Sequence, residues 1–413
     1  MQVVDHAQSL GNYFVDVDGN TILDLNASAT GSVLGYNPDD YFFWSLNSLQ
    51  KLAPKRANPH ALPADDLDDL IRENVLPSAP LGQTYAHFAK GATATDANDL
   101  VASIAMKQYA AAHGIEDMGK VSVLGFNNSH HGDSTTTLSF SSDDANPEGK
   151  TAFPWPRAEF PKMKYPFAYN QKDNAAEEDR CVQSLVDLVK SERSAGTHVA
   201  AIFMEPMSTF GQEMATPAFY KKVLAFAKSE GIALVVDETK TGMGASGKNW
   251  AHEHWYLFEG QEPDFVTFGG KSGVAGFFTN KSHKLDDAET ASLLQNVHAD
   301  QLTAYGKTWD TIAAENLLHK LGDTSSFLKI ELARVGRETG DVHNVRGYGT
   351  HLAFDCSDGY LLQRWLWRNG INVTRCGPNT ISLRPALILG CYDAAHLRNT
   401  LFKYHPNFVL NYD

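Results

Sequence analysis

Several features are scarce in this sequence, and each absence excludes a class of protein. No run of apolar residues reaches the roughly 18 needed to span a bilayer. No Lys/Arg-rich run offsets the net charge of −14, which argues against a protein that tracks nucleic-acid phosphates. The first ten residues, MQVVDHAQSL, contain no Arg and include Asp5, so they do not resemble a targeting presequence.

Cysteine is also scarce, since four cysteines occur in 413 residues and none is in a CxxC pair. This scatter predicts free thiols in a reducing compartment and neither a disulfide framework nor a zinc site. The four are Cys181, Cys356, Cys376 and Cys391. The chain is long enough for two domains, and its 43% hydrophobic and 20% charged residues are typical of a globular protein.

Two apolar runs end in groups that carry chemistry. Residues Ile232–Val236 stop at Asp237, and residues Phe265–Phe268 are followed by two glycines and Lys271. Unbroken aliphatic runs of this length are typical of strands buried on both faces of a parallel sheet. Ligands bind at the carboxyl ends of such strands, and pyridoxal phosphate needs both a lysine amine and an acid. The alternative is an Asp that caps a helix and a Lys at the surface.

The rest of the chain alternates between predicted strands and helices. Strands are expected at 121–126 and 198–204, and helices at 182–194 and 217–229. A hairpin is expected at 12–25, and amphipathic helices at 63–76 and from the glycine-containing segment 89–96 to about 112. The polar segment 141–180 is expected to be a loop. This pattern predicts an α/β fold with a mainly parallel central sheet and a smaller C-terminal α/β domain.

Several segments, in order, resemble the class III (fold type I) pyridoxal-phosphate aminotransferases, and most closely the eukaryotic 4-aminobutyrate aminotransferases. The matching segments are NYFVDVDGNTILDL from residue 12, EFPKMKYP from 159, MEPM from 204, VDE from 236, GKNWAHEHW from 247, VRGYGT from 345 and the pair Arg384-Pro385. The resemblance implies an N-terminal hairpin segment at 1–45, a large domain at 46–300 and a small domain at 301–413.

The resemblance also assigns roles around a cofactor. Gly91 and Ala92 would form the floor of the phosphate-binding loop, and Thr308 would reach the phosphate of a neighbouring subunit. Asp237 would hold the ring nitrogen, and Glu205 belongs to the same site. His130 stands where relatives have a stacking aromatic ring. Lys240 stands where relatives have a glutamine that touches the phenolic oxygen of the cofactor.

Other positions depart from the family pattern. Ala92 lacks the hydroxyl that the family prefers, and Asp133 replaces the arginine that grips the substrate carboxylate. Phe210 and Ser382 replace the glutamate and arginine of a salt bridge found in relatives with an arginine switch. Loss of one partner would leave a buried charge unpaired, so their joint loss is physically coherent.

The lysine lies one residue away from the family position. Counted from Asp264, or back from Gly276 in the eukaryotic pattern, the Schiff-base lysine falls at Gly270. Counted against the shorter bacterial loop, it falls at Lys271. A shift of one residue can turn a side chain to the opposite face, so the amine of Lys271 could face the cofactor or the wall behind it.

Histidines occur in pairs, but a metal site is not expected. Adjacent residues such as His130 and His131 rarely converge on one ion, and the segment around His252 and His254 also occurs in relatives without metal. Packing is the favoured interpretation for these rings.

We therefore hold two functional hypotheses. The first is a catalytically degenerate aminotransferase that serves as a structural or regulatory subunit, as a homodimer or in a larger assembly. Relatives suggest a mitochondrial location, with a cytoplasmic one as the alternative. The second is an active transaminase that uses pyridoxal phosphate on Lys271 and an amino donor other than 4-aminobutyrate. Cofactor binding without turnover lies between them.

Overall fold

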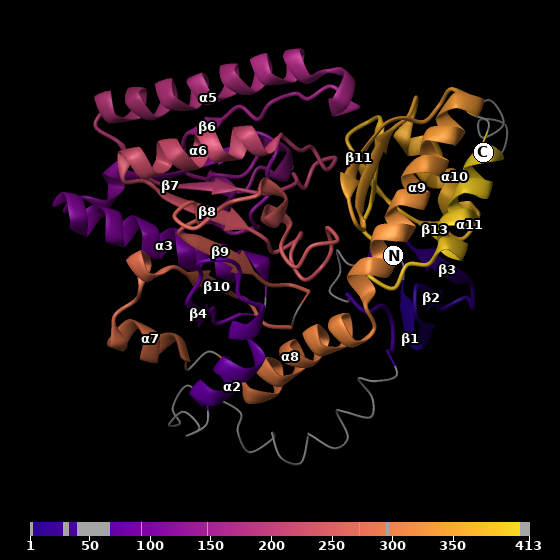
Figure 1. The fold of residues 1–413 in the computed structure, drawn as a ribbon, viewed down its shortest axis with the longest axis horizontal. Helices are drawn as coiled ribbons and strands as arrows, with labels where there is room; N and C mark the ends of the chain where they lie inside the picture. Colours follow the sequence, from indigo (N-terminus) through magenta and orange to yellow (C-terminus); the bar gives the residue numbers. More distant parts are fainter. Residues whose placement is uncertain are drawn as a thin grey trace.

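The computed structural model describes residues 3–27, 33–38, 67–91, 93–146, 148–271, 273–294 and 297–404. A seven-stranded sheet forms one half of the molecule and two four-stranded sheets lie in the other half (Figure 1). In spatial order, the large sheet consists of β4 (Tyr85–Phe88), β10 (Gly276–Thr279), β9 (Phe265–Phe268), β8 (Ala233–Asp237), β7 (His198–Met204), β5 (Val121–Phe126) and β6 (Arg157–Ala158).

The large sheet is mainly parallel, as predicted. Strands β6, β5, β7, β8 and β9 pair in parallel, whereas β10 runs antiparallel to both β9 and β4. Parallel strands need crossover helices, which the alternation of strands and helices supplies. The helices that cover this sheet are α3 (Ala94–His113), α5 (Gln171–Ser194) and α6 (Pro217–Glu230).

Alternate strand residues face two different cores, because successive side chains in a strand point to opposite sides. Ile202, Leu234 and Val266 pack in the core that includes residues of α5 and α6. Phe203 and Val235 pack in the core that includes residues of α3. Because both faces of these strands are buried, their sequences are continuous apolar runs.

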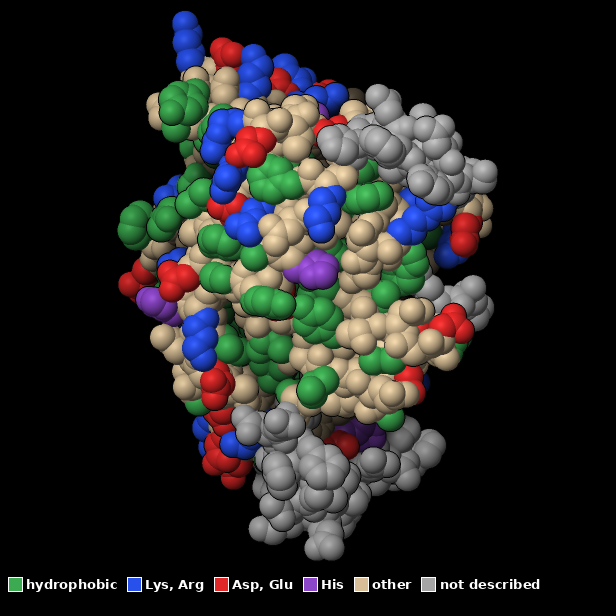
Figure 2. Space-filling view, turned by 90° about the vertical axis from the view of Figure 1, so that its right-hand side faces the viewer, with side chains coloured by type: hydrophobic (Ala, Val, Ile, Leu, Met, Phe, Trp, Pro, Cys, Tyr) green, Lys and Arg blue, Asp and Glu red, His purple; other side chains and the backbone are tan. Residues whose placement is uncertain are grey.

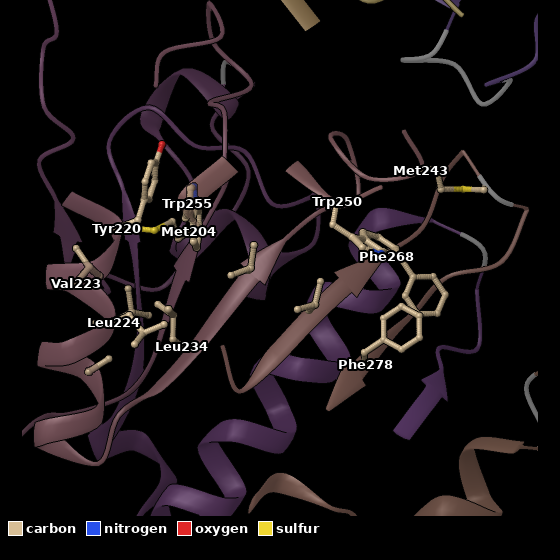
Figure 3. Close-up of a cluster of buried hydrophobic side chains, with 14 of the residues drawn as sticks. Met204, Tyr220, Val223, Leu224, Leu234, Met243, Trp250, Trp255, Phe268 and Phe278 are labelled. Carbon is tan, nitrogen blue, oxygen red and sulfur yellow. The ribbon is translucent and has the colours of Figure 1, made fainter. Parts of the chain in front are cut away.

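Aromatic side chains fill the first of these cores toward the carboxyl end of the sheet. Tyr220 stacks on Trp255 with ring centroids 4.2 Å apart, and Phe268 lies 4.8 Å from Phe278 (Figure 3). Trp250 meets Phe278 edge-on at 5.7 Å. The GKNWAHEHW segment thus places both of its tryptophans in the core.

The second half of the molecule is built from both ends of the chain. Its first sheet contains β1 (Val4–Leu10), β2 (Tyr13–Asp16), β3 (Thr21–Asp24) and β13 (Ile371–Asn372), and its second contains β11 (His343–Tyr348), β12 (His351–Asp355), β15 (Thr380–Leu383) and β14 (Thr374–Cys376). The β2–β3 pair confirms the hairpin predicted at 12–25. The remaining helices are α2 (Leu67–Asn74), α4 (Thr135–Ser139), α7 (Asp287–Leu294), α8 (Ala299–Ala314), α9 (Leu317–Thr339), α10 (Gly359–Arg368) and α11 (Cys391–Phe402).

The space-filling view of this half shows hydrophobic side chains spread through the centre of the face, with charged side chains mainly toward its margins (Figure 2). Within the described ranges, no helix combines the length and the apolar character needed to cross a membrane.

One predicted element was wrong. The segment 141–180 was expected to be a loop, but α5 begins at Gln171 and also extends the helix predicted at 182–194. Its first turns are rich in charged residues, yet Asn174, Glu178 and Cys181 are buried at helical spacing. Because two of these buried residues are polar, the sequence does not show the apolar periodicity that usually indicates an amphipathic helix. The predicted start of α2 at 63–66 lies outside the described residues, as does the proposed boundary at residue 45.

We expect the core of the large sheet to be sensitive to a small cavity. Ile202 is fully buried at the centre of β7, so Ile202→Ala should lower the free energy of unfolding by about 2–5 kcal/mol. Ile330 on α9 is 63% exposed, and Ile330→Ala should change it by about 0.5 kcal/mol or less. Chemical denaturation of both variants checks this, and equal effects would contradict the described packing.

Candidate active site

The candidate site lies where β5, β7, β8 and β9 end, because parallel strands bring their carboxyl ends to one edge. Asp237 is the last residue of β8 and is 1% exposed. One of its oxygens accepts hydrogen bonds from His131 Nδ1 at 2.7 Å and Asn98 Nδ2 at 2.8 Å. The other accepts from the backbone N–H of Thr239 at 3.0 Å and from its hydroxyl at 2.5 Å.

These contacts keep Asp237 ionised. Burial raises its pKa, but the positive charge of Lys240 and the hydrogen bonds from His131 and Thr239 outweigh burial and hold the pKa below its ordinary value. A permanently charged carboxylate at the end of β8 is the group needed to keep a ring nitrogen protonated.

A second buried carboxylate follows immediately. Glu238 is 1% exposed and accepts hydrogen bonds from the backbone N–H and from Nδ1 of His252, both at 2.8 Å. Thr241 donates its hydroxyl to the other oxygen. His252 therefore stabilises a carboxylate. No group of three or more His, Cys, Asp or Glu suited to a metal ion occurs in the part of the chain that the structure describes.

Glu205 and Lys240 form an ion pair in the middle of the site. Lys240 Nζ lies 3.0 Å from Glu205 Oε1 and also donates to the carbonyl of His130. Glu205 is 5% exposed, and it accepts two more hydrogen bonds from Thr209, at 2.9 Å from the backbone N–H and 2.5 Å from the hydroxyl. A lysine that could have pointed to solvent is instead the counter-charge of a buried acid.

The amine of Lys271 points into the site. It donates to the backbone carbonyl of Lys240, and the residue is 8% exposed. Burial first, and then the positive charge of Arg384, lower the pKa of this amine to about 7. Such a lowered pKa is typical of lysines that act as nucleophiles.

A tight turn at Gly270 explains this orientation. The N–H of Lys271 donates to the carbonyl of Gly269 at 2.8 Å, and Gly270 between them has a φ of 71°. A three-residue turn with positive φ is strained for any residue other than glycine. The turn directs the side chain of Lys271 toward the site.

The positions that would grip a substrate carboxylate hold no available cation. Asp133 is largely exposed and its carboxylate lies 3.4 Å from His130 Nε2. His130 lies 6.3 Å from the ring of Phe210, measured between centroids. The residue at the arginine position, Ser382, is fully buried and hydrogen-bonds the side chain of Gln212 at 2.7 Å.

Two guanidinium groups near this position are occupied by the protein itself. Arg384 donates to the carbonyl of Thr209, and the amide oxygen of Gln212, in the orientation its neighbours favour, accepts from Arg384 at 3.0 and 3.1 Å. Arg346 is 3.0 Å from Asp355 and 3.2 Å from Glu213.

Two predicted residues have their described contacts within their own helical segments. Gly91 lies against Asp96, which forms a capping box with Thr93 at the start of α3. Thr308 is buried on α8 and donates to the carbonyl of Ala304 at 2.9 Å. Ala92 lies outside the described residues.

Sequence reasoning missed several residues that complete the site. Asn98 is separated from Asp237 by 139 positions, and no local pattern connects them. Gln212 has a φ of 51° and is fully buried, which the sequence does not signal. His131 was considered only as a metal ligand, although a buried strand ending in Asp237 requires a donor of this kind.

Comparison with known proteins agrees with this geometry. The family model described as "Aminotransferase class-III" matches residues 1–403. The chain belongs to the class III aminotransferases. The 4-aminobutyrate aminotransferase of Schizosaccharomyces pombe is 30% identical over 419 residues, covering 93% of this chain and 85% of the relative. The mitochondrial 4-aminobutyrate aminotransferase of Mus musculus is 29% identical and covers 97% of this chain and 84% of the relative.

Solved structures support the fold. A lysine aminotransferase from M. tuberculosis superposes with a TM-score of 0.83 at 22% identity, covering 98% of this chain and 95% of the other. The match confirms fold type I. The family uses pyridoxal phosphate, and two groups of this site suit it, because a buried ionised Asp237 and a buried amine of low pKa on Lys271 stand at neighbouring strand ends.

The His131–Asp237 pair should matter for stability. Replacing His131 by Leu removes one donor from a buried carboxylate and should cost about 3–5 kcal/mol of unfolding free energy. The exposed Arg72–Asp69 pair is the matched control, and Asp69→Asn should cost about 1 kcal/mol or less. Thermal and chemical unfolding measure both. A His131→Leu variant as stable as Asp69→Asn would show that the pair is not needed.

Proposed function

We propose that this protein keeps the class III fold without amino-acid transaminase activity, and that it acts as a structural or regulatory subunit. The observation that supports the proposal most directly is that Ser382, which the resemblance places at the arginine of the switch, hydrogen-bonds the neutral side chain of Gln212. Relatives are named for 4-aminobutyrate, which carries a carboxylate. A carboxylate brought into this region would lose its hydration beside a neutral pair, and the neighbouring Arg384 already donates to Thr209 and Gln212.

The energetic consequence of a missing arginine supports the proposal. A charge-assisted hydrogen bond contributes about 1.5–3 kcal/mol, and an arginine fork makes two of them to a carboxylate. Losing such an anchor also loosens the orientation on which rate depends. Arg384 and Arg346 do not replace it, because their donors bind Thr209, Gln212 and Asp355.

The proposed subunit role is based on the core and the sheet order, which the chain retains. Class III aminotransferases are commonly dimeric, and the core and the sheet order of this chain are complete without the substrate groups. Relatives from Mus musculus and Caenorhabditis elegans are named as mitochondrial proteins, which supports a mitochondrial location for this one. Homodimer formation, or membership of a larger assembly, is part of the proposal.

One observation favours a second candidate, a transaminase that uses Lys271. The inward amine has a pKa of about 7, and Asp237 could hold a ring nitrogen protonated. Pyridoxal phosphate, when bound, supplies an electron sink for the carbon next to the amino group. Lys271 would then hold and move the proton at that carbon, and Asp237 would keep its charge throughout. Asp133 and Lys240 would favour a donor other than 4-aminobutyrate.

The two candidates differ in a direct assay. With pyridoxal phosphate, 4-aminobutyrate and a 2-oxo acid as acceptor, we expect no product above the enzyme-free blank, because the carboxylate has no anchor. The Schizosaccharomyces pombe relative, assayed in parallel, is the positive control. Turnover by this chain that is abolished in Lys271→Met would reject the first candidate. A panel of amines without carboxylates tests the second.

The same sample should be examined by absorption spectroscopy before and after borohydride reduction, followed by peptide mapping. A visible absorption band, together with a reduced cofactor adduct mapped to Lys271, would establish cofactor attachment even if no turnover occurs. Attachment without turnover would support a binding role at the same site.

A further inference from the structure

Three hydrogen-bond donors converge on the side-chain oxygen of Gln212. In the orientation that its neighbours favour, this amide oxygen accepts from Nε and Nη2 of Arg384 at 3.0 and 3.1 Å, and from the hydroxyl of Ser382 at 2.7 Å. Arginine presents pairs of N–H groups to carboxylates in the same way, and a hydrogen bond to an ionised oxygen is about twice as strong as one to a neutral oxygen. The donors therefore suit a carboxylate better than the amide that they hold.

The guanidinium group of Arg384 is buried, and the hydrogen bonds described for it go to neutral oxygens. Arg384 is 8% exposed, and its second acceptor is the backbone carbonyl of Thr209. A buried cation is costly without a counter-charge, and the binding of an anion would offset that cost.

The groups around Arg384 do not supply this counter-charge. The charged and titratable groups that face it are Glu205, Cys376, Lys271 and His351. Glu205 is the one carboxylate of this set, and it pairs with Lys240 at 3.0 Å. Burial holds the pKa of His351 well below its usual range, so its ring is neutral. The surroundings of Arg384 are therefore compatible with one further anion.

The backbone holds Gln212 against these donors. Gln212 is fully buried and has a φ of 51°, a left-handed conformation that residues with a Cβ rarely adopt. The carbonyl of the preceding Gly211 accepts from Arg346 Nε at 2.7 Å, which fixes the loop on the β11 strand. Strained residues of this kind persist where the surrounding contacts hold them in place, and they are concentrated at functional sites.

We propose that Gln212 is a specificity-determining residue, because its amide occupies Arg384 and Ser382 as an internal ligand and excludes free carboxylates from them. The excluded ligands are small aliphatic carboxylates, since the glutamine side chain has the size and shape of propionamide. The inference deepens the proposed function and rests on it, because both take free carboxylates to be unanchored in this region.

The first test removes the internal ligand. Glycine adopts a φ near 51° without strain, so Gln212→Gly deletes the side chain and leaves the turn relaxed. Propionate is the probe, with chloride at equal ionic strength as its reference and propionamide as a neutral ligand of the same shape. We expect saturating propionate to raise the Tm of Gln212→Gly by about 2 °C or more, propionamide to raise it less, and wild type to be unaffected by either.

Two control variants separate binding at Arg384 from a general effect of the probe. Gln212→Gly/Arg384→Lys keeps the positive charge but loses the planar guanidinium, and should lose the stabilisation by propionate. Gln8→Gly makes the same substitution at an exposed residue and should respond to propionate as wild type does.

A second variant supplies the negative oxygen within the chain. Gln212→Glu preserves the shape of the side chain, and Arg384 should hold the pKa of the new carboxyl below the value of about 4.3 that it has in the unfolded chain. The resulting stability is fully present above that unfolded pKa and is lost as the pH falls through the lowered folded pKa. We expect a Tm above that of wild type at pH 7, and an advantage that disappears on acidification. This variant decides the question if Gln212→Gly does not fold.

The outcomes against the proposal are equally specific. A folded Gln212→Gly variant that propionate does not stabilise, or a Gln212→Glu variant less stable than wild type at pH 7, would overturn the carboxylate site. Stabilisation of the wild-type chain by propionate that Arg384→Lys abolishes would overturn the exclusion by Gln212. These measurements need neither cofactor nor turnover. Transamination of 4-aminobutyrate by the wild-type chain would therefore reject the proposed function without deciding this test.

Discussion

The arrangement of the site depends on burying two consecutive carboxylates at the end of one strand. Asp237 and Glu238 are each 1% exposed, and each is bound by a different histidine, His131 and His252. A buried charge without partners would cost several kcal/mol, so the loops that carry these histidines must dock on the strand end for the fold to form. Lys240 then binds the carbonyl of His130 in one of those loops, and the amine of Lys271 binds the carbonyl of Lys240.

Much of this was predictable, because it follows from strand periodicity. The runs before Asp237 and Gly269 read as buried strands, and the structure has strands there, so the meeting of Asp237 and Lys271 at one edge followed. The start of α5 was missed because buried Asn174 and Glu178 look polar in sequence. The inward direction of the Lys271 side chain depends on one backbone angle at Gly270. The hydrogen bond between Asn98 and Asp237 depends on tertiary packing. Neither leaves a local pattern.

The fold and the substrate chemistry are supported by different residues. The cores are made of aliphatic and aromatic side chains on the sheet and its helices, whereas His130, Glu205 and Lys240 lie in the loops that follow β5, β7 and β8. The buried Gln212–Ser382 pair is neutral, so neither side chain adds an unpaired charge that would lower stability. A chain can therefore keep nearly all of its architecture while its substrate-binding groups change.

The turn at Gly270 also constrains which residue position 270 can carry. A residue with a Cβ at position 270 would have to adopt a φ near 71°, a conformation that such residues rarely accept, and it would strain the turn that directs Lys271 inward. The direction of the Lys271 amine therefore depends on a neighbour that has no side chain of its own.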